Sequence, residues 1–415
     1  MEMRIKRPFT VLSFSQLLLT SAVAAPLSEM DGQGRIVVDG EPTFVHGIYH
    51  DTMDVSPPRY AEDFRGDAER IAATDFNAIW LSLDPSFGDV VMENFAYLQS
   101  KGILVVSSFD AANAESVVPN YTEVEPLLSL ATADDFNSDG GASPSQIADY
   151  RAVVEKYLPN VLTFASGAAH PALTLDGYAE VMDAMGLQCY PISNTNGNVP
   201  GGEAYELEMC DDMFTFARNE LGADYPILPT LQAFKWYSGD ARYPTAQELR
   251  NMLFTTLQFD PAGVFWYSYY DGTQLLGEDR PALWEELTLL TAEVKQLEQA
   301  LLHGDYTKVR NPDDPYMEGA EGAWHAAYWE LEGQTYVIVT NTDKDTEKAV
   351  SFEVPGSGTM KPLFDDARYG DTLRYEGGTI QGTIEPESVH VYVLGGDGGS
   401  SRPNPPENLC AEPCS

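Results

Sequence analysis

Short apolar runs alternate with amphipathic stretches along most of this 415-residue chain. Eight of the runs have the length and apolar character of buried β-strands, and each is followed by a stretch that could form a helix. They lie at residues 44–49, 78–83, 103–109, 127–133, 162–166, 187–192, 227–232 and 263–269. Strands that alternate with helices predict a parallel sheet, and eight such units predict an α/β fold, a closed (β/α)8 or TIM barrel. A doubly wound open sheet is the alternative.

Local signals mark where several elements begin and end. Asp39-Gly40 separates two short runs and has the residue types of a tight hairpin turn. The segments 143–146 (SPSQ) and 245–248 (TAQE) both fit a capping box, so we expect helices to begin there. The last helix carries an apolar stripe at steps of three or four residues, made up of Leu283, Leu287, Leu290, Val294, Leu297 and Leu301. This helix ends near His303-Gly304, where we place the end of the barrel.

The pattern changes to short alternating runs after residue 305. Such runs, separated by turn residues, predict antiparallel strands, most simply a small β-sandwich. They lie at 326–331, 335–340, 349–354 and 388–394. We therefore expect a barrel domain over residues 25–305, a β-sandwich over 306–395, and a flexible tail rich in glycine, serine and proline over 396–415.

The first 24 residues have the organisation of a secretory signal peptide. Arg4, Lys6 and Arg7 precede the apolar run 11–19, and the small residues Ala22-Val23-Ala24 suit a cleavage site. We therefore predict a secreted or periplasmic protein. No later stretch is long and apolar enough to predict a transmembrane helix, so we expect no membrane partner.

Composition narrows the range of partners. The chain has 64 acidic and 24 basic residues, a formal charge of −40, which argues against nucleic acid and against an anionic membrane surface. Four cysteines in an exported chain permit at most two local disulfides, one between Cys189 and Cys210 and one between Cys410 and Cys414. A metal site made of these cysteines is not expected, because they lack Cys-x-x-Cys spacing and neighbouring histidines.

Polar and aromatic residues gather where the predicted strands end. In a (β/α)8 barrel these carboxyl ends carry the site. The polar residues there are His50, Asp51, Asp84, Asp110, Asp134, Asp135, Gln232 and Asp271. The aromatic residues are Trp80, Phe109, Tyr190, Phe234, Trp236, Tyr237, Trp266, Tyr267, Tyr269 and Tyr270. Carboxyl groups beside aromatic rings are what a carbohydrate site requires, since sugar rings stack on aromatic faces and two carboxyl groups carry out glycosidic cleavage.

Several segments resemble glycoside hydrolases of the (β/α)8-barrel superfamily, in particular a poorly characterised group with a β-sandwich behind the barrel. The segment 35–47 (RIVVDGEPTFVHG) resembles the opening hairpin and first strand of such barrels, and 189–192 (CYPI) resembles their sixth strand. The segments 231–234 (LQAF), 243–245 (YPT), 248–250 (ELR) and 263–268 (GVFWYS) resemble strands 7 and 8 with the residues between them. The likeness covers most of residues 34–305.

The resemblance implies roles for particular residues. Members of this superfamily carry the proton donor after strand 4, which makes Asp135 the first choice for general acid and Asp134 the alternative or its hydrogen-bonding neighbour. The same superfamily carries a nucleophilic glutamate after strand 7, where this chain has Gln232. Three possibilities follow: an inverting enzyme with Asp110, Asp84 or Asp271 as base, a substrate-assisted reaction, or a barrel that binds sugar without cleaving it.

The remaining rim residues are expected to bind the carbohydrate. We assign substrate contacts to His50, Trp80, Asp84, Tyr190, Gln232, Trp236, Trp266 and Tyr269. A metal ion is not expected at His46 and His50, because four residues of a strand span about 13 Å, and His170 has no cluster of ligands around it. No cofactor is implied, since phosphate loops and dinucleotide fingerprints are missing from the sequence. A glycoside hydrolase is therefore the leading hypothesis, with a sugar-binding barrel or a hydrolase or lyase of another bond as alternatives.

Overall fold

A computed structural model describes residues 28–52, 61–109, 111–138, 141–168, 174–175, 177–192, 207–236, 241–309, 311, 323–364 and 372–395. The predicted signal peptide, Asp110, His170 and the predicted tail lie outside the described residues. Among the described helices, none is long and apolar enough to cross a membrane.

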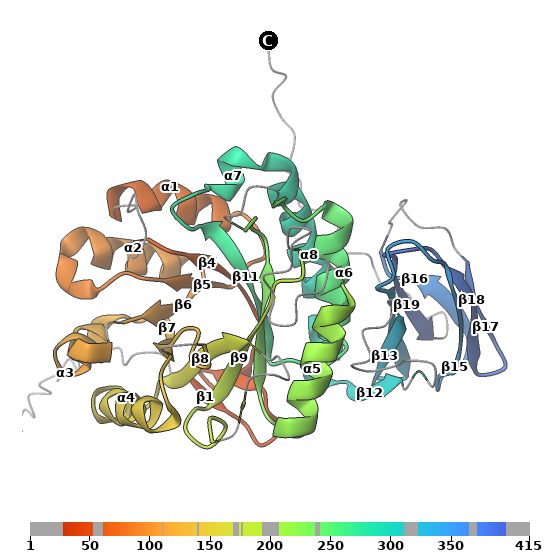
Figure 1. Cartoon of the computed structure of the whole chain (residues 1–415), viewed down its shortest axis with the longest axis horizontal. Coiled ribbons are helices and arrows are strands. Elements are labelled where there is room, and N and C mark those ends of the chain that lie inside the picture. The colour runs from red at the N-terminus through yellow and green to blue at the C-terminus, as the bar shows by residue number, and fades with distance from the viewer. Residues whose placement is uncertain are drawn as a thin grey trace, which may run out of the picture.

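Eight parallel strands close into a barrel in the order β10-β11-β4-β5-β6-β7-β8-β9 (Figure 1). Their bounds are β4 Val45–His50, β5 Ala78–Leu81, β6 Leu104–Ser108, β7 Leu127–Ala133, β8 Leu162–Ala168, β9 Ala184–Cys189, β10 Ile227–Gln232 and β11 Gly263–Tyr270. The predicted barrel is confirmed, and the open sheet is excluded. The sixth strand begins three residues before the predicted run, because Gly186 interrupts the apolar pattern just before residue 187.

Helices surround the barrel on its outer side. Their bounds are α1 Ala61–Ile71, α2 Asp89–Ser100, α3 Ala114–Val117, α4 Pro144–Tyr157, α5 Glu208–Leu221, α6 Ala246–Leu257, α7 Leu276–Asp279 and α8 Pro281–His303, with 3₁₀ turns η1 Pro85–Phe87, η2 Ala111–Asn113 and η3 Val118–Glu123. Both predicted capping boxes are present, at the starts of α4 and α6. Between β8 and β9 the described residues form turns rather than the predicted helix.

A small three-stranded sheet lies at the amino-terminal end of the barrel. It consists of β1 Ser28–Met30, β2 Ile36–Val38 and β3 Glu41–Pro42, in that order. Asp39 and Gly40 have φ angles of 52° and 85°, as the predicted tight turn requires. Ile36 belongs to the apolar cluster inside the barrel, so this sheet closes the end of the barrel that is opposite the predicted site.

Two antiparallel sheets form the predicted β-sandwich. One sheet has the order β12-β13-β14-β19-β16 and the other β15-β18-β17. Their bounds are β12 Asp305–Val309, β13 Trp324–Leu331, β14 Gln334–Asn341, β15 Lys348–Glu353, β16 Thr359–Pro362, β17 Leu373–Glu376, β18 Thr379–Ile384 and β19 Val389–Gly395. Trp329 and Ile338 of the first sheet share one apolar cluster with residues of α6 and α8. The sandwich therefore packs against the barrel on the side of α6 and α8 (Figure 1).

Candidate active site

Asp134 is the acidic residue that directly follows β7. Its Oδ1 accepts hydrogen bonds from Nε2 of Gln188 at 3.0 Å and from the backbone N–H of Asp135 at 3.2 Å. Gln188 also donates to the hydroxyl of Ser166 at 3.2 Å, so one side chain joins strands β7, β8 and β9 at their carboxyl ends. These contacts hold the Asp134 carboxyl at the barrel end where the site was expected.

The environment of Asp134 favours its protonated form. Burial, followed by the negative charges of Asp135 and Asp51, raises the pKa of Asp134 from 3.8 to about 7. The residue is nevertheless exposed when its whole surface is considered. Both observations hold, because an opening to solvent on one side exposes a residue, whereas desolvation depends on how much protein surrounds the charge.

Asp51 supplies a second carboxyl group to the same site. It follows β4, and its Oδ2 accepts a hydrogen bond of 2.7 Å from the hydroxyl of Tyr267 on β11. Its backbone N–H donates to the carbonyl of Tyr270 at 2.9 Å, which fixes the residue to the same strand. Burial and the charge of Asp51 raise the pKa of Tyr267 far above its usual range, so Tyr267 remains a hydrogen-bond donor.

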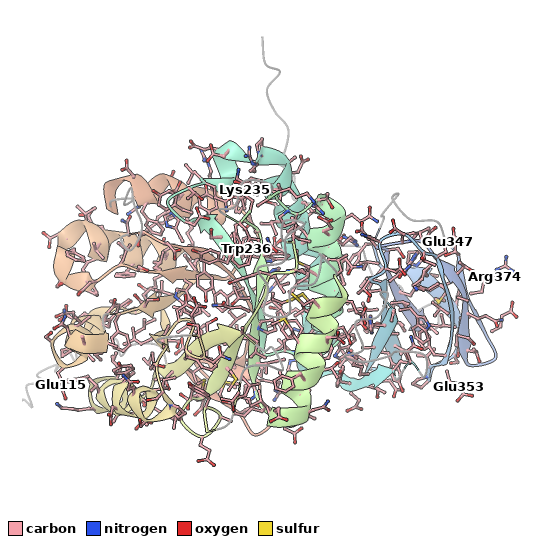
Figure 2. The ribbon with its side chains drawn as sticks, in the orientation of Figure 1. Glu115, Lys235, Trp236, Glu347, Glu353 and Arg374 are labelled. Atoms are coloured by element: carbon pink, nitrogen blue, oxygen red, sulfur yellow. A yellow bond between two sulfur atoms is a disulfide. The ribbon has the colours of Figure 1, made fainter. Side chains whose placement is uncertain are left out.

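Four aromatic rings lie beside these carboxyl groups: Tyr190, Phe234, Trp236 and Tyr267, which we call the rim aromatic cluster. Phe234 packs edge-on against the other three, with ring centroids 5.1 to 5.3 Å apart. Burial raises the pKa of Tyr190 far above its usual range, and the charges of Asp134, Asp135 and Asp51 raise it further. Tyr190 is therefore close to all three carboxylates. Figure 2 shows Trp236 lying over the barrel, away from the sandwich.

Polar groups also line the barrel interior near Asp134. Tyr49 points inward from β4, stacks on Trp80 at 4.2 Å, and is 2% exposed. Its hydroxyl is close enough to the hydroxyls of Thr230 and Ser166 to affect its pKa, but meets neither in hydrogen-bond geometry.

Three predicted substrate contacts face the surrounding helices instead of the barrel mouth. His50 is fully buried, and its Nε2 pairs with Oδ2 of Asp67 on α1 at 3.0 Å. Trp266 donates from Nε1 to Nε2 of His46 at 3.1 Å, and Tyr269 stacks on His50. Successive strand residues point to opposite sides of a sheet, so these three side chains fall on the outer side. The predicted substrate role of all three is corrected by this placement.

Other predicted rim residues support the local structure. Trp80 is 2% exposed inside the barrel and donates from Nε1 to the hydroxyl of Ser108. Asp84 caps the 3₁₀ turn η1 by accepting from the backbone of Ser86. Asp271 is buried. Its Oδ1 accepts hydrogen bonds from the backbone N–H groups of Thr273 and Gln274 and from the hydroxyl of Thr273. These contacts give Trp80, Asp84 and Asp271 structural roles, and their predicted roles in the site stay predictions.

Gln232 is completely buried and uses its amide to hold the chain after β9. Its Oε1 accepts from the backbone N–H of Ile192 at 2.8 Å, and its Nε2 donates to the carbonyls of Ile192 and Phe234 at 2.8 and 3.1 Å. A glutamate would face two carbonyl oxygens here. The glutamine is therefore required by the backbone around it, and the predicted substrate contact at Gln232 is not supported.

Of the twelve predicted site residues, the structure brings together Asp134, Asp135, Tyr190 and Trp236, while Asp110 lies outside the described residues. It adds Asp51 and Tyr267, which the sequence indicated only as strand-end residues. The alternation of side chains along β4 could have identified Asp51. Because side chains two residues apart point to the same side of a strand, Asp51 points inward like Tyr49.

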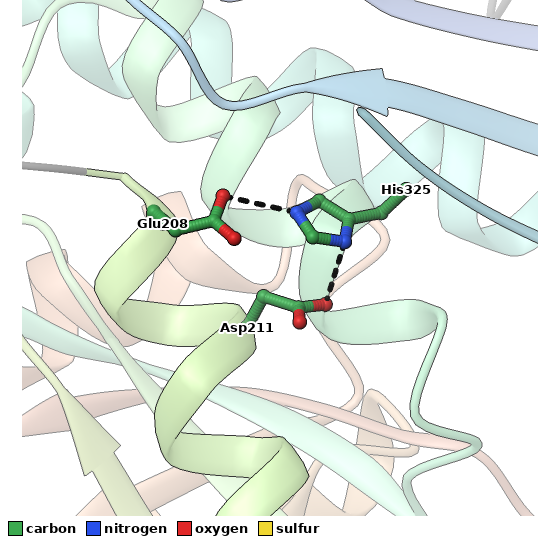
Figure 3. Close-up of side chains that lie close together, drawn as sticks. All are labelled: Glu208, Asp211 and His325. Atoms are coloured by element: carbon green, nitrogen blue, oxygen red, sulfur yellow. Dashed lines mark hydrogen bonds and ion pairs between the residues drawn. The ribbon is translucent and has the colours of Figure 1, made fainter. Parts of the chain in front are cut away.

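One buried cluster has the residue types of a metal centre, but its charges are already balanced. Glu208 and Asp211 of α5 face His325 of β13, with Nε2 3.0 Å from Glu208 and Nδ1 3.3 Å from Asp211 (Figure 3). Lys308 of β12 lies 2.7 Å from the same Asp211 oxygen. Because each ring nitrogen of His325 faces a carboxylate, the ring fits a proton on both nitrogens better than a metal ion. We call Glu208, Asp211, Lys308 and His325 the interdomain ion cluster.

No protein-family model and no curated protein matches the sequence. Solved structures are similar to it in fold. An α-amylase from Anoxybacillus has a TM-score of 0.57 and 13% identity, covering 86% of this chain and 99% of that chain. A family 5 glycoside hydrolase from Bacteroides vulgatus has a TM-score of 0.57 and 10% identity, covering 89% and 93%. A family 27 β-L-arabinopyranosidase from Geobacillus stearothermophilus has a TM-score of 0.55 and 11% identity, covering 85% and 97%. The chain therefore shares its fold with barrel glycoside hydrolases.

Proposed function

We propose that this protein is a glycoside hydrolase that acts outside the cytoplasm on a polysaccharide or oligosaccharide. The observation that carries the proposal is the raised pKa of Asp134, about 7, beside a second carboxyl group and an aromatic cluster at the carboxyl end of the barrel. A carboxylic acid that keeps its proton near neutral pH can donate it to the leaving glycosidic oxygen. We therefore assign the general acid to Asp134 rather than to Asp135.

Asp51 is the second carboxyl group of the proposed mechanism. The hydrogen bond from Tyr267 stabilises its ionised form, which suits it to act on the anomeric carbon, either by direct attack or by activating water. The choice between the two routes determines whether the product keeps or inverts the anomeric configuration. The configuration of the first product, read by NMR, distinguishes them.

The structural role of Gln232 bears on the alternative of a non-catalytic barrel. That alternative depends on Gln232 being the remnant of a lost nucleophile. The side-chain amide of Gln232 forms hydrogen bonds with the backbone after β9. This structural role accounts for a glutamine at this position without a lost nucleophile.

We propose export because the first residues combine charged, apolar and small-residue segments in the order of a signal peptide, and a cell fractionation experiment tests it.

Release of reducing ends from a panel of glycans tests the hydrolase proposal. We expect Asp134→Asn and Asp51→Asn each to lower kcat/KM by about 100- to 10,000-fold, the range for loss of a general acid or base. Glu353→Gln, on the exposed edge of the sandwich (Figure 2), is the matched control that removes one charge far from the barrel. Native protein that releases nothing, or an Asp134→Asn variant that keeps full activity while folded, contradicts the proposal.

A further inference from the structure

Strand β9 carries one amide side chain, Gln188, in a sequence that is otherwise apolar. Gln188 is the only one of the six strand residues that is not fully buried. Its neighbours Leu187 and Cys189 belong to the apolar cluster that joins the barrel strands to the surrounding helices, and a disulfide joins Cys189 to Cys210 of α5. Side chains alternate along a strand, so Gln188 points to the inner side, as Tyr190 of the rim aromatic cluster does.

The amide of Gln188 is held by two neighbouring strands. Its Nε2 donates to Oδ1 of Asp134 at 3.0 Å and to the hydroxyl of Ser166 at 3.2 Å. A primary amide has two N–H donors, so both donors are used. Gly186 allows β8 and β9 to approach closely here, because a Cβ at this position would lie 3.0 Å from Cβ of Ser166. The amide is therefore fixed in its orientation toward Asp134.

These hydrogen bonds make the two carboxyl oxygens of Asp134 different. Oδ1 accepts from Gln188 and also from the backbone N–H of Asp135 at 3.2 Å. An oxygen that accepts two hydrogen bonds has both lone pairs engaged, so a proton on Oδ1 would displace one of the donors. Oδ2 accepts from none of the described residues, and a proton there leaves both hydrogen bonds intact. The contacts around Asp134 therefore favour a proton on Oδ2.

We propose that Gln188 is the positioning residue of the general acid: its amide keeps Oδ1 of Asp134 an acceptor, so that Oδ2 holds the proton and presents it to the leaving glycosidic oxygen. This inference rests on the proposed function, because it concerns the acid of the same site. As the bond between the anomeric carbon and this oxygen breaks, the electron pair stays on the oxygen, which takes the proton from Oδ2. Asp134 becomes a carboxylate, and the hydrogen bond from Gln188 becomes charge-assisted and stronger.

The pH dependence of activity reports on this hydrogen bond. A donor to Asp134 stabilises its ionised form, so loss of the Gln188 amide should raise the pKa of Asp134 above about 7. The other titratable groups that act on Asp134 are Asp135, Asp51, Tyr49 and Tyr190. All four remain in a variant at Gln188. A shift of the falling part of the pH profile in such a variant therefore reports the loss of the amide.

Two variants of Gln188 and two kinds of substrate test the inference. The substrates are a glycan from which the native protein releases reducing ends and the dinitrophenyl glycoside of the same sugar, whose leaving group needs no proton. In Gln188→Leu we expect kcat/KM for the glycan to fall about 10- to 100-fold, the effect of a misplaced catalytic group, and kcat/KM for the dinitrophenyl glycoside to stay near native. The falling part of the glycan profile should move to higher pH.

Gln188→Glu keeps the size of the side chain and places a second carboxyl group beside Oδ1. Two adjacent carboxyl groups share a proton, so the falling part of the profile should move still further upward. Gln296→Leu makes the matched substitution on the exposed side of α8 and should keep the native values. Native kcat/KM for the glycan in Gln188→Leu overturns the inference. Equal losses on both substrates with an unmoved profile overturn it too, because they indicate a structural role alone.

Titration of Asp134 by carbon NMR of labelled aspartate needs no substrate. The signal is assigned from its loss in Asp134→Asn. A raised pKa of Asp134 in Gln188→Leu supports the inference, and where no glycan is cleaved by the native protein, only the hydrolase proposal then fails. An unchanged pKa in this variant overturns the inference and leaves the hydrolase proposal standing.

Discussion

Replacing His325 by glutamine removes the positive charge that joins two buried carboxylates between barrel and sandwich. Burial alone would lower the pKa of His325, but the charges of Asp211 and Glu208 outweigh it and raise the pKa from 6.5 to about 9. Burial would likewise raise the pKa of Glu208, but His325 and its hydrogen-bond donors lower it from 4.5 to about 2. The cluster therefore favours a protonated histidine between ionised carboxylates.

The size of the effect follows from these shifts. A rise from 6.5 to about 9 corresponds to about 3 kcal/mol of folding free energy. Because the pKa is raised in the folded state, this stabilisation is complete below about pH 6.5 and is lost as the pH rises through about 9. The shift of Glu208 describes much of the same interaction and is not added to it. Removing one member of a buried ion pair costs about 3–5 kcal/mol, so we expect His325→Gln to lose that amount near pH 6.

Urea denaturation of the native protein and His325→Gln from about pH 5 to 10 measures this difference. The native free energy of unfolding should decline above about pH 6.5, while the variant should start lower and lack that decline. His303→Gln is the control, because His303 is an exposed histidine at the end of α8. A variant as stable as the native protein at pH 6, or one with an unchanged pH dependence, would refute the reasoning.

Further predictions concern metal, the proton donor, Gln232 and the disulfide. A chelator should leave the melting temperature unchanged, because the charge of His325 already balances the cluster; a lower melting temperature would indicate a bound metal ion. Activity should fall as the pH rises through about 7, where Asp134 loses its proton, and a profile flat across that range would exclude it as the acid. Gln232→Glu should destabilise the protein by about 3 kcal/mol, because its carboxylate would face two carbonyl oxygens, and should not raise activity. Reduction of the confirmed Cys189–Cys210 disulfide, which spans 21 residues, should lower the free energy of unfolding by about 3 kcal/mol, as urea titration with and without reductant would show.

Local physics made much of the fold predictable from the sequence. Two capping boxes located the starts of α4 and α6, and Asp39-Gly40 located a turn, because each depends only on neighbouring residues. The apolar runs located β7 and β10 to the residue. Eight strand–helix units then left the barrel as the simplest closed arrangement.

The sequence alone therefore determined the barrel, the order of its strands and most of its helices, and it predicted the end of the barrel at which the candidate site lies. Only the tertiary structure decided which strand-end side chains face that site. His50 and Asp51 are neighbours in the chain, yet His50 pairs with Asp67 on the outer side whereas Asp51 accepts from Tyr267 inside. The side on which a residue falls depends on the register of the strand, and a shift of one residue reverses it. Barrel closure, which joins β4 to β11, then brings together side chains more than two hundred residues apart, a proximity that no local pattern encodes.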